Sequence, residues 1–318
     1  HYATVTGTDP TARKEYLVVG AHFDHLGNGG RGSSSLRPDT LEVHNGADDN
    51  ASGVAAMLEL AGRFAEHTGA PRHSMIFVAF GGEEMGLLGS KYFADHLPVD
   101  AGAITAMINL DMVGRLDTAK GLQIGGAGTS AEADSLIRNA NQTTRLKLIV
   151  TREGSGPSDH ASFYGKNIPV FFLTTGVHPD YHTPDDDAER INYEGLKTVT
   201  DFTAGLIREI DNCPQRLTFR EAGPKEQAGP GYRFRVTLGF MPDFTDSDVE
   251  GVRVDFVSKG KPAERGGILK GDIIRAIDNM PVRNIYDYMY RLSKLTRGRI
   301  ISVEILRGNQ ALILPIQL

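Results

Sequence analysis

The chain has 318 residues, of which 40% are hydrophobic, and a formal net charge of −6. At roughly 150 residues per domain this length suggests about two domains, and the composition excludes a wholly disordered chain. The single cysteine excludes an internal disulfide framework and a cysteine-rich zinc module. The chain contains no run of about 18 apolar residues that would form a transmembrane helix, and its acidic balance disfavours nucleic acid as a partner.

The first part of the chain alternates short apolar runs with helical patterns. Four runs are typical of buried strands: Tyr16–Val19, Met75–Phe80, Ile104–Leu110 and Ile168–Leu173. Apolar residues recur at helical spacing over Val54–Ala65, where Asn50 or Ser52 is placed to cap the helix, and a second helix is expected over Tyr193–Ile210. Because nearly all-apolar strands alternate with helices, we predict an α/β fold with a mostly parallel (mixed) sheet and helices on both faces.

The second part of the chain differs from the first in its composition, its apolar pattern and its charge. Residues 213–230 are rich in proline, glycine and charge, so we expect them to link residues 1–212 to residues 231–318. The last segment contains five expected strands and one expected helix: Phe234–Leu238, Val252–Val257, Asp272–Ile277, Ile300–Leu306 and Leu312–Leu318, with the helix at Ile285–Leu295. It holds 14 Lys+Arg and 10 Asp+Glu, so the rest of the chain carries a formal charge of −10. The sequence therefore predicts a small β-rich domain joined to a larger, acidic one.

Histidines and carboxylates follow the apolar runs or, at Asp48 and Asp49, lead into the first expected helix, so we expect them at the sheet edge where open α/β proteins bind ligands. These polar residues are His22, Asp24, His25, Asp48, Asp49, Glu83, Glu84, Asp111, Tyr181 and His182. Mutually repelling carboxylates gathered in one place require a compensating charge, which a divalent metal supplies. Nitrogen and oxygen ligands without thiolate suit zinc, with manganese or cobalt as substitutes, and their number favours two metals sharing one carboxylate. Each motif taken singly also fits an ordinary helix start or turn, so the prediction depends on their joint occurrence.

The chain resembles the di-zinc aminopeptidase family of peptidase clan MH, whose relatives include leucyl aminopeptidases, glutamate carboxypeptidases and glutaminyl cyclases. The resemblance rests on six stretches in the family's order: AHFDHLG, NGADDNASG, FGGEEMGLLGS, INLDMVG, SDHASF and YHTPDDD. They span His22–Asp187, most of the first domain. The resemblance implies a catalytic domain of the zinc-exopeptidase type that hydrolyses the N-terminal residue of peptides.

By this resemblance, five residues bind two Zn2+ ions, with Mn2+ or Co2+ as substitutes. One zinc is held by His22, Asp49 and Asp111, and the other by Asp49, Glu84 and His182. Asp49 is therefore the bridging carboxylate, and a water molecule shared by the two metals is the expected nucleophile.

The resemblance also implies residues that act beside the metals. Glu83 is the expected general base, and Tyr181 is expected to stabilise the tetrahedral intermediate. The carboxylate of Asp24 is expected to accept a hydrogen bond from the far ring nitrogen of His22 and so fix its tautomer. The Asp49–Asn50 bond is a candidate for the non-proline cis peptide of this family. His25 is expected to be structural.

Three alternatives remain open. A glutaminyl cyclase shares the fold but uses one zinc, and His22 together with Asp111 argues against it. A dipeptidase or carboxypeptidase differs in loops that the motifs do not specify. A catalytically inactive peptide-binding scaffold is the alternative of another class, and the intact Glu83 and ligand set argue against it.

The last domain resembles a circularly permuted PDZ domain of the bacterial sort in three stretches: TLGFMP, GVRV and GGILKGDII. PDZ domains capture a peptide C-terminus on the backbone N–H groups of a loop, here Leu238, Gly239 and Phe240. The expected partners are therefore peptide substrates and a peptide C-terminus. From the same resemblance we expect a secreted or periplasmic protein.

Overall fold

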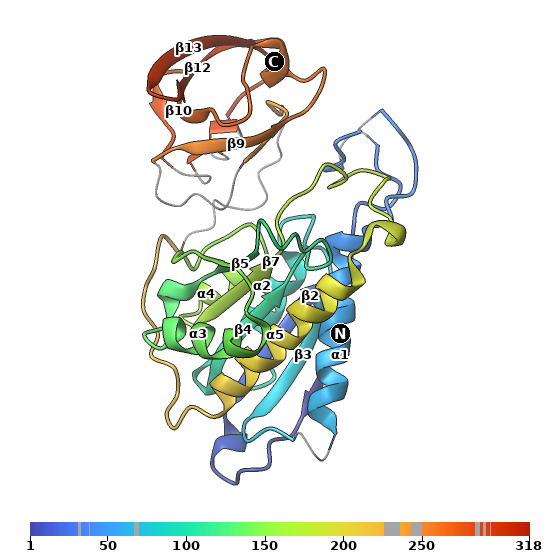
Figure 1. Ribbon diagram of the computed structural model, residues 1–318, viewed down its shortest axis with the longest axis vertical. Coiled ribbons are helices and arrows are strands. Elements are labelled where there is room, and N and C mark those ends of the chain that lie inside the picture. The colour runs from blue at the N-terminus through green and yellow to red at the C-terminus, as the bar shows by residue number, and fades with distance from the viewer. Residues whose placement is uncertain are drawn as a thin grey trace. The chain divides into compact units, whose positions relative to one another are not determined.

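The chain forms two compact units in a computed structural model, His1–Gln227 and Ala228–Leu318 (Figure 1). The structure describes residues 1–30, 33–37, 39–66, 70–225, 236–242, 250–283, 287–288, 291–292 and 294–318. Among the helices that it describes, none combines the length and apolar composition of a membrane span.

The first unit is built on a seven-stranded sheet in the order β1-β3-β2-β4-β7-β5-β6. Its strands are β1 (Tyr2–Val5), β2 (Tyr16–His22), β3 (Ser74–Phe80), β4 (Ile104–Leu110), β5 (Leu122–Gly125), β6 (Leu148–Val150) and β7 (Val170–Thr174). Strands β3, β2, β4 and β7 are parallel, whereas β1 is antiparallel to β3 and β5 is antiparallel to β7. The predicted mixed, mostly parallel sheet is therefore confirmed, and the carboxyl ends of its four central strands meet at one edge.

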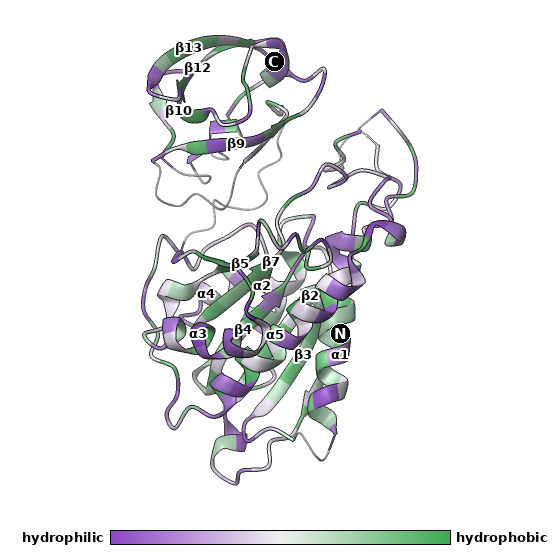
Figure 2. Cartoon of the chain, viewed as in Figure 1, coloured by the Kyte–Doolittle hydropathy of each residue, from purple (hydrophilic) through white to green (hydrophobic). Residues whose placement is uncertain are grey.

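Helices cover both faces of this sheet (Figure 1). They are α1 (Gly53–Ala65), α2 (Leu88–Asp95), α3 (Ala133–Thr144), α4 (His160–Tyr164) and α5 (Tyr193–Asp211), with short helical turns at Ala12–Lys14, Ala47–Ser52, Ala101–Ala103, Ala127–Thr129 and Ala188–Arg190. Leu17 and Val19 of β2 pack in one core with Leu60 of α1, whereas Val18 between them packs in a second core with Phe163 of α4. Because side chains alternate across a strand, a strand covered on both faces is apolar throughout, which explains the unbroken apolar runs (Figure 2).

Element boundaries follow local chemistry. Helix α1 is capped by Asn50, whose side-chain oxygen accepts a hydrogen bond from the Gly53 N–H at 3.0 Å. Helix α5 begins at Tyr193, as expected, because the Asn192 side chain accepts from the Gly195 N–H. Strand β7 starts at Val170, two residues later than expected, because Pro169 has no N–H to donate to a neighbouring strand.

Part of the expected linker packs on the first unit instead. Leu217 is buried in its core, and Phe219 pairs with Ser130 in an isolated β-bridge. The Tyr164 hydroxyl donates to the Gly223 carbonyl at 2.6 Å and accepts from the Ala222 N–H at 2.8 Å. Residues 213–225 therefore belong to the first unit, because their apolar and main-chain groups find partners there, and residues 226–230 lie outside the described part of the chain.

The second unit is an antiparallel sheet in the order β13-β12-β10-β9-β8, with β11 paired to β10. Its elements are β8 (Phe240–Pro242), β9 (Val252–Val257), α6 (Pro262–Arg265), β10 (Ile273–Ile277), β11 (Met280–Pro281), β12 (Ile300–Arg307) and β13 (Gln310–Gln317). These elements confirm a small β-rich domain with its own apolar core. Within the expected helix Ile285–Leu295, residues 287–288 and 291–292 are helical and residues 294–295 are not, and the other five residues lie outside the described part of the chain.

One expected strand of the second unit is displaced. Residues 234–235 lie outside the described part of the chain, and Val236–Leu238 are not in a strand. The Leu238 carbonyl accepts from the Ala263 N–H at 2.7 Å, and Gly239 has a φ of 77°. A residue with positive φ interrupts an extended strand, so pairing begins at Phe240.

Candidate metal centre

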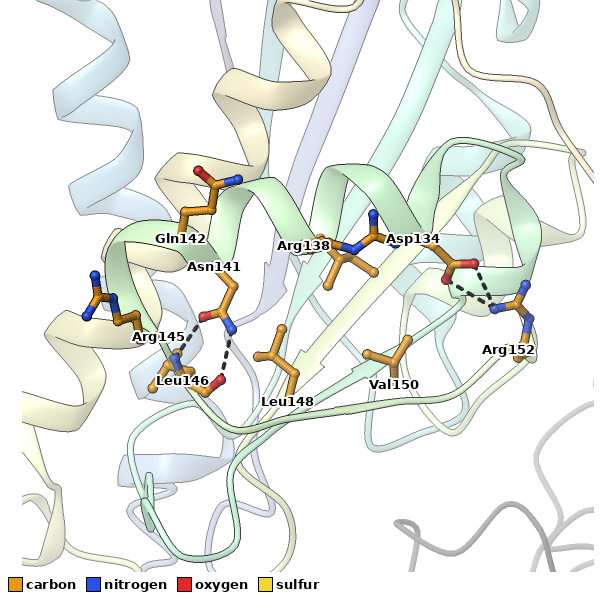
Figure 3. Close-up of a pocket in the computed structure, with 10 residues that line it drawn as sticks. Asp134, Arg138, Asn141, Gln142, Arg145, Leu146, Leu148, Val150 and Arg152 are labelled. Carbon is orange, nitrogen blue, oxygen red and sulfur yellow. Dashed lines mark hydrogen bonds and ion pairs between the residues drawn. The ribbon is translucent and has the colours of Figure 1, made fainter.

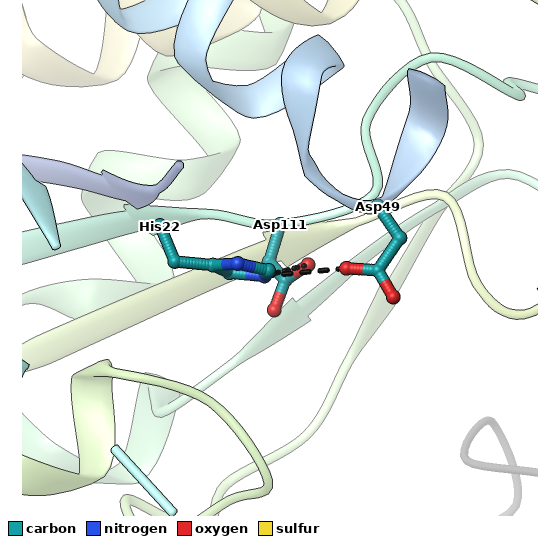
Figure 4. Close-up of side chains that lie close together, drawn as sticks. All are labelled: His22, Asp49 and Asp111. Atoms are coloured by element: carbon teal, nitrogen blue, oxygen red, sulfur yellow. Dashed lines mark ion pairs between the residues drawn. The ribbon is translucent and has the colours of Figure 1, made fainter. Parts of the chain in front are cut away.

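Histidine and carboxylate side chains from five segments meet at the carboxyl edge of the central strands. His22 ends β2, Asp111 follows β4, and Glu84 follows β3. His182 lies in the long connection after β7, and Asp49 lies in the turn Ala47–Ser52 before α1. The structure therefore brings together all five residues expected to bind metal, three of which are drawn in Figure 4.

The Asp49 carboxylate lies between two imidazole rings. Its Oδ1 is 3.2 Å from Nε2 of His22, and its Oδ2 is 3.1 Å from Nε2 of His182. Each imidazole also faces a second carboxylate: Oδ1 of Asp111 is 3.4 Å from His22 Nε2, and Oε2 of Glu84 is 3.2 Å from His182 Nε2. The Asp49 carboxylate is thus shared by two groups of side chains. His22 and Asp111 lie on the side of Oδ1, and His182 and Glu84 lie on the side of Oδ2.

The backbone on either side of Asp49 is held by neighbouring segments. The Asp49–Asn50 peptide bond is cis, as the resemblance implied. The N–H groups of Asp48 and Asp49 both donate to Oδ2 of Asp186, at 2.9 and 3.0 Å. The Asn50 side chain donates to the Leu110 carbonyl at the end of β4, at 2.9 Å. These bonds fix the Asp49 carboxylate relative to the central strands.

Each of these two imidazoles is oriented by a main-chain carbonyl. Nδ1 of His22 is 3.0 Å from the Asp24 carbonyl oxygen, and Nδ1 of His182 is 3.1 Å from the Ser34 carbonyl oxygen. The expectation that the Asp24 carboxylate accepts from His22 is wrong, because that carboxylate is 3.9 Å away and instead accepts from the Glu83 N–H at 3.1 Å. Because Nδ1–H is bonded to a carbonyl, Nε2 is the ring atom that faces the carboxylates and that would bind a metal once it has lost its own proton.

Ser158 orients Asp111, a role that sequence reasoning missed. Its hydroxyl donates to Oδ2 of Asp111 at 2.7 Å and accepts from the Asn109 side chain at 2.7 Å. Oδ1 of Asp111 is buried and has no hydrogen-bond partner among the described residues. The stretch SDHASF, which begins with Ser158, was the available signal in the sequence.

The electrostatics of the site favour a bound cation. Although burial opposes it, hydrogen bonds to Asp49 and Glu84 raise the pKa of His182 to about 10. Burial raises the pKa of Glu83 well above its usual range, and the carboxylates of Asp159, Asp111 and Glu84 push the pKa in the same direction. Protons thus compensate the gathered carboxylates when no cation is bound.

Tyr181 lies beside the second set of ligands. Its ring stacks on that of His182, with 3.7 Å between the centroids and 21° between the planes. Desolvation raises the pKa of Tyr181 well above its usual range, and the nearby carboxylates act in the same direction. The hydroxyl therefore keeps its proton at neutral pH and remains a hydrogen-bond donor.

The donor atoms fit divalent metal ions. The candidate atoms of His22, Asp49 and Asp111 lie within 4.8 Å of one another, as do those of His25, Asp49 and Glu84. They are nitrogen and carboxylate oxygen atoms without thiolate, and one buried oxygen of Asp111 has no hydrogen bond that a metal would need to displace.

Other polar residues surround this centre without belonging to it. Nε2 of His178 is 3.2 Å from Oδ2 of Asp48, and His44 is hydrogen-bonded to Ser35 at 2.8 Å. The pocket drawn in Figure 3 lies over α3 and β6, where Arg152 pairs with Asp134, and none of the candidate ligands lines it. The chemistry is therefore concentrated at the carboxyl edge of the sheet and not in this pocket.

Comparison with known proteins agrees with this picture. The model of peptidase family M28 matches residues 2–207, and a PDZ domain model matches residues 231–318. The chain is 33% identical to aminopeptidase YwaD of Bacillus subtilis over 180 residues, which is 54% of this chain and 39% of that protein. It is 29% identical to the uncharacterized Escherichia coli protein YfbL over 221 residues, which is 60% of this chain and 66% of that protein. The chain thus spans between about two fifths and two thirds of the length of these curated relatives.

Two solved structures share the fold of the first unit. An aminopeptidase from Aneurinibacillus sp. strain AM-1 has a TM-score of 0.55 and 29% identity, covering 70% of this chain and 50% of that one. A zinc aminopeptidase from Bacillus subtilis has a TM-score of 0.54 and 28% identity, covering 65% of this chain and 49% of that one.

Proposed function

The chain belongs to peptidase family M28, and we propose that it is a zinc-dependent aminopeptidase that removes the N-terminal residue of peptides. The observation that carries the proposal is the Asp49 carboxylate, which faces His22 through one oxygen and His182 through the other. His22, Asp49 and Asp111 would hold one zinc, and Asp49, Glu84 and His182 would hold the second. The relatives that are named aminopeptidases support this assignment.

Zinc bound in this way lowers the pKa of a water molecule and polarises the carbonyl group of the scissile bond. The chain itself supplies the proton transfer. Glu83 directly precedes the ligand Glu84, and desolvation raises its pKa, so its carboxylate is suited to take a proton from water and to pass it to the leaving amine.

Tyr181 and the acidic character of the catalytic part of the chain complete the proposal. The Tyr181 hydroxyl keeps its proton and would donate it in a hydrogen bond to the oxygen that gains negative charge. The residues before 231 carry a formal charge of −10. Such a charge favours a substrate with a free α-amine, whose pKa of about 8 keeps it largely protonated at neutral pH.

We propose that the second unit binds a peptide C-terminus at Leu238, Gly239 and Phe240. Within the described part of the second unit, strand β8 is the last strand of its sheet, and its outer edge could pair with an added strand. Gly239 has positive φ, and a Cβ at this position would lie 2.1 Å from Cβ of Lys261. The loop is therefore shaped around a glycine, because a larger residue would overlap the Lys261 stem. A secreted or periplasmic location, implied by the resemblance, stays a prediction that cell fractionation would test.

Metal content measured together with substrate preference tests the proposed activity. We expect close to two zinc ions per chain, cleavage of peptides with a free amino end, and no cleavage of their N-acetylated counterparts. Equal cleavage of both would refute amino-end specificity and favour another hydrolase of this fold. Two bound zinc ions without any cleavage would favour the peptide-binding scaffold, whereas one zinc and cyclisation of an N-terminal glutamine would favour the cyclase.

A further inference from the structure

His25 is a half-buried histidine of the candidate centre that the proposed reaction does not use. Its side chain is 9% exposed, and its Nδ1 is 3.0 Å from Oε1 of Glu84. The other oxygen of Glu84, Oε2, is 3.2 Å from Nε2 of His182. The Glu84 carboxylate is therefore enclosed by two imidazoles that approach different oxygens.

The ring of His25 is placed differently from those of the two expected ligands. His22 and His182 both present Nε2 to the carboxylates and bond Nδ1 to a main-chain carbonyl. His25 presents Nδ1 instead, and its Nε2 is buried without a hydrogen-bond partner among the described residues. Metal-binding histidines almost always donate their second ring N–H, and His25 lacks an acceptor for that bond.

The hydrogen-bond balance selects one tautomer of His25. If Nδ1 bound a metal, the proton would sit on Nε2, where a buried N–H would have no acceptor. If Nδ1 carries the proton, it donates to Oε1 of Glu84, and only a lone pair on Nε2 stays unpaired. Unpaired buried N–H groups are rarer than unpaired acceptors, so the donor tautomer is favoured. The carboxylate of Asp49 does not compete for this proton, because its Oδ2 is 3.8 Å away.

The absence of a side chain at Gly46 leaves space for the ring of His25. Gly46 has a φ of 61°, and a Cβ at this position would lie 2.6 Å from Cγ and 2.8 Å from Cδ2 of His25. Gly46 lies three residues before Asp49, so the segment that carries the bridging carboxylate is in contact with the ring of His25. The ring also meets the edge of the His182 ring, with 5.7 Å between centroids and 71° between planes.

We propose that His25 is a positioning residue whose Nδ1–H holds Oε1 of Glu84, so that Glu84 offers only Oε2 to the cation it shares with Asp49 and His182. The inference rests on the proposed two-metal function. It predicts that the zinc affinity of the site formed by Asp49, Glu84 and His182 depends on a hydrogen-bond donor at the place of Nδ1, and not on the imidazole ring itself.

Three variants of the full chain separate a donor from a ligand. His25→Asn keeps a donor, because the asparagine amide nitrogen is bonded to Cγ as Nδ1 is, but it removes the imidazole. His25→Gln places its amide one bond farther out, and His25→Ala removes the group. Zinc affinity is measured by chelator competition, and the absorption spectrum of the cobalt-loaded protein reports the coordination. His96→Asn is the matched control, because His96 is exposed and its ring is hydrogen-bonded to the Tyr92 carbonyl of the preceding helix.

We expect His25→Asn to keep the affinity of the weaker zinc and the cobalt spectrum, whereas His25→Gln and His25→Ala weaken that zinc by about 10- to 100-fold, as loss of a ligand's hydrogen-bond partner does. Unfolding midpoints of the metal-free variants identify any loss that is due to folding. Equal losses in His25→Asn and His25→Ala, with a changed cobalt spectrum, would overturn the proposal in favour of direct coordination. Unchanged affinity in all three variants would overturn it altogether. If the unaltered chain binds fewer than two zinc ions, the proposed function itself fails.

Discussion

Asp186 is predicted to hold the segment that carries the Asp49 carboxylate, although it is not itself one of the proposed ligands. It is fully buried, and one oxygen accepts the N–H groups of both Asp48 and Asp49, at 2.9 and 3.0 Å. Its other oxygen is 3.5 Å from the guanidinium of Arg115. The substitution Asp186→Ala removes the acceptor and leaves two buried donors without a partner.

The expected loss in the free energy of unfolding follows from the number of donors that are left unpaired. A buried donor left unpaired costs about 1–3 kcal/mol, so two of them should lower the free energy of unfolding by about 2–6 kcal/mol. Asp186→Asn keeps one oxygen that accepts both N–H groups, so it should cost less than about 2 kcal/mol, the difference between a charged and a neutral acceptor. Because the two donors belong to Asp49 and to the residue before it, the alanine variant should also lose about 10- to 100-fold in zinc affinity if Asp49 binds the metals as proposed.

Urea unfolding of the metal-free protein, followed by circular dichroism, measures the first effect, and chelator competition measures the second. Asp185→Ala is the matched control, because Asp185 is the adjacent residue, is 40% exposed and pairs with Arg37 at the surface. Exposed ion pairs contribute about 0–1 kcal/mol, so the control should change little. An Asp186→Ala variant as stable as the Asp185→Ala variant, with unchanged zinc affinity, would refute this reasoning.

Four further outcomes are expected. Glu83→Gln should keep both zinc ions and lose at least about 10²-fold in kcat; near-normal turnover would contradict a general base. Because hydrogen bonds to carboxylates raise the pKa of His182 to about 10, zinc binding at pH 8 should release protons and zinc affinity should rise with pH; calorimetry in buffers of different ionisation enthalpy measures this, and a pH-independent affinity would contradict it. A chain ending at Gln227 should fold and hydrolyse small substrates, whereas one ending at Asp211 should be less stable because it lacks the residues that pack on the first unit; equal thermal midpoints would contradict this. Gly239→Val should weaken binding of a peptide C-terminus in a fluorescence titration without changing small-substrate turnover, since a Cβ there overlaps the Lys261 stem; unaltered binding would remove the loop from the proposed peptide site.

Much of the fold and of the candidate site could be predicted from the spacing of the motifs and from the apolar pattern of the strands. The run Ile104–Leu110 became a strand with the predicted bounds, because a strand buried on both faces is recognisable from its own residues. The five expected ligands converge because each follows or precedes an element that could be predicted locally. The linker was harder to delimit, because proline and glycine content does not reveal that Leu217 is buried in the core of the first unit.

The missed features involve groups that have no signature in a sequence. The acceptors that orient His22 and His182 are main-chain carbonyls, which every residue carries, so no pattern distinguishes Ser34 from its neighbours. The resemblance implied that the Asp24 carboxylate accepts a hydrogen bond from the ring of His22, but that carboxylate accepts from the Glu83 N–H instead. Side-chain identity therefore located these residues without specifying which atom bonds to which.

The sequence by itself determined the fold class, the two-part division of the chain and the identity of the residues that gather at the sheet edge. Local patterns suffice for these because burial, capping and strand formation depend on residues that are close along the chain. Only the tertiary structure decided which hydrogen-bond partners orient those side chains. Ser34 meets His182 across 148 positions, and Asp186 meets Asp48 across 138. Such contacts form when distant segments pack, so the tautomers of the imidazoles, the anchoring of Asp49 and the placement of His25 against Glu84 depend on the whole fold.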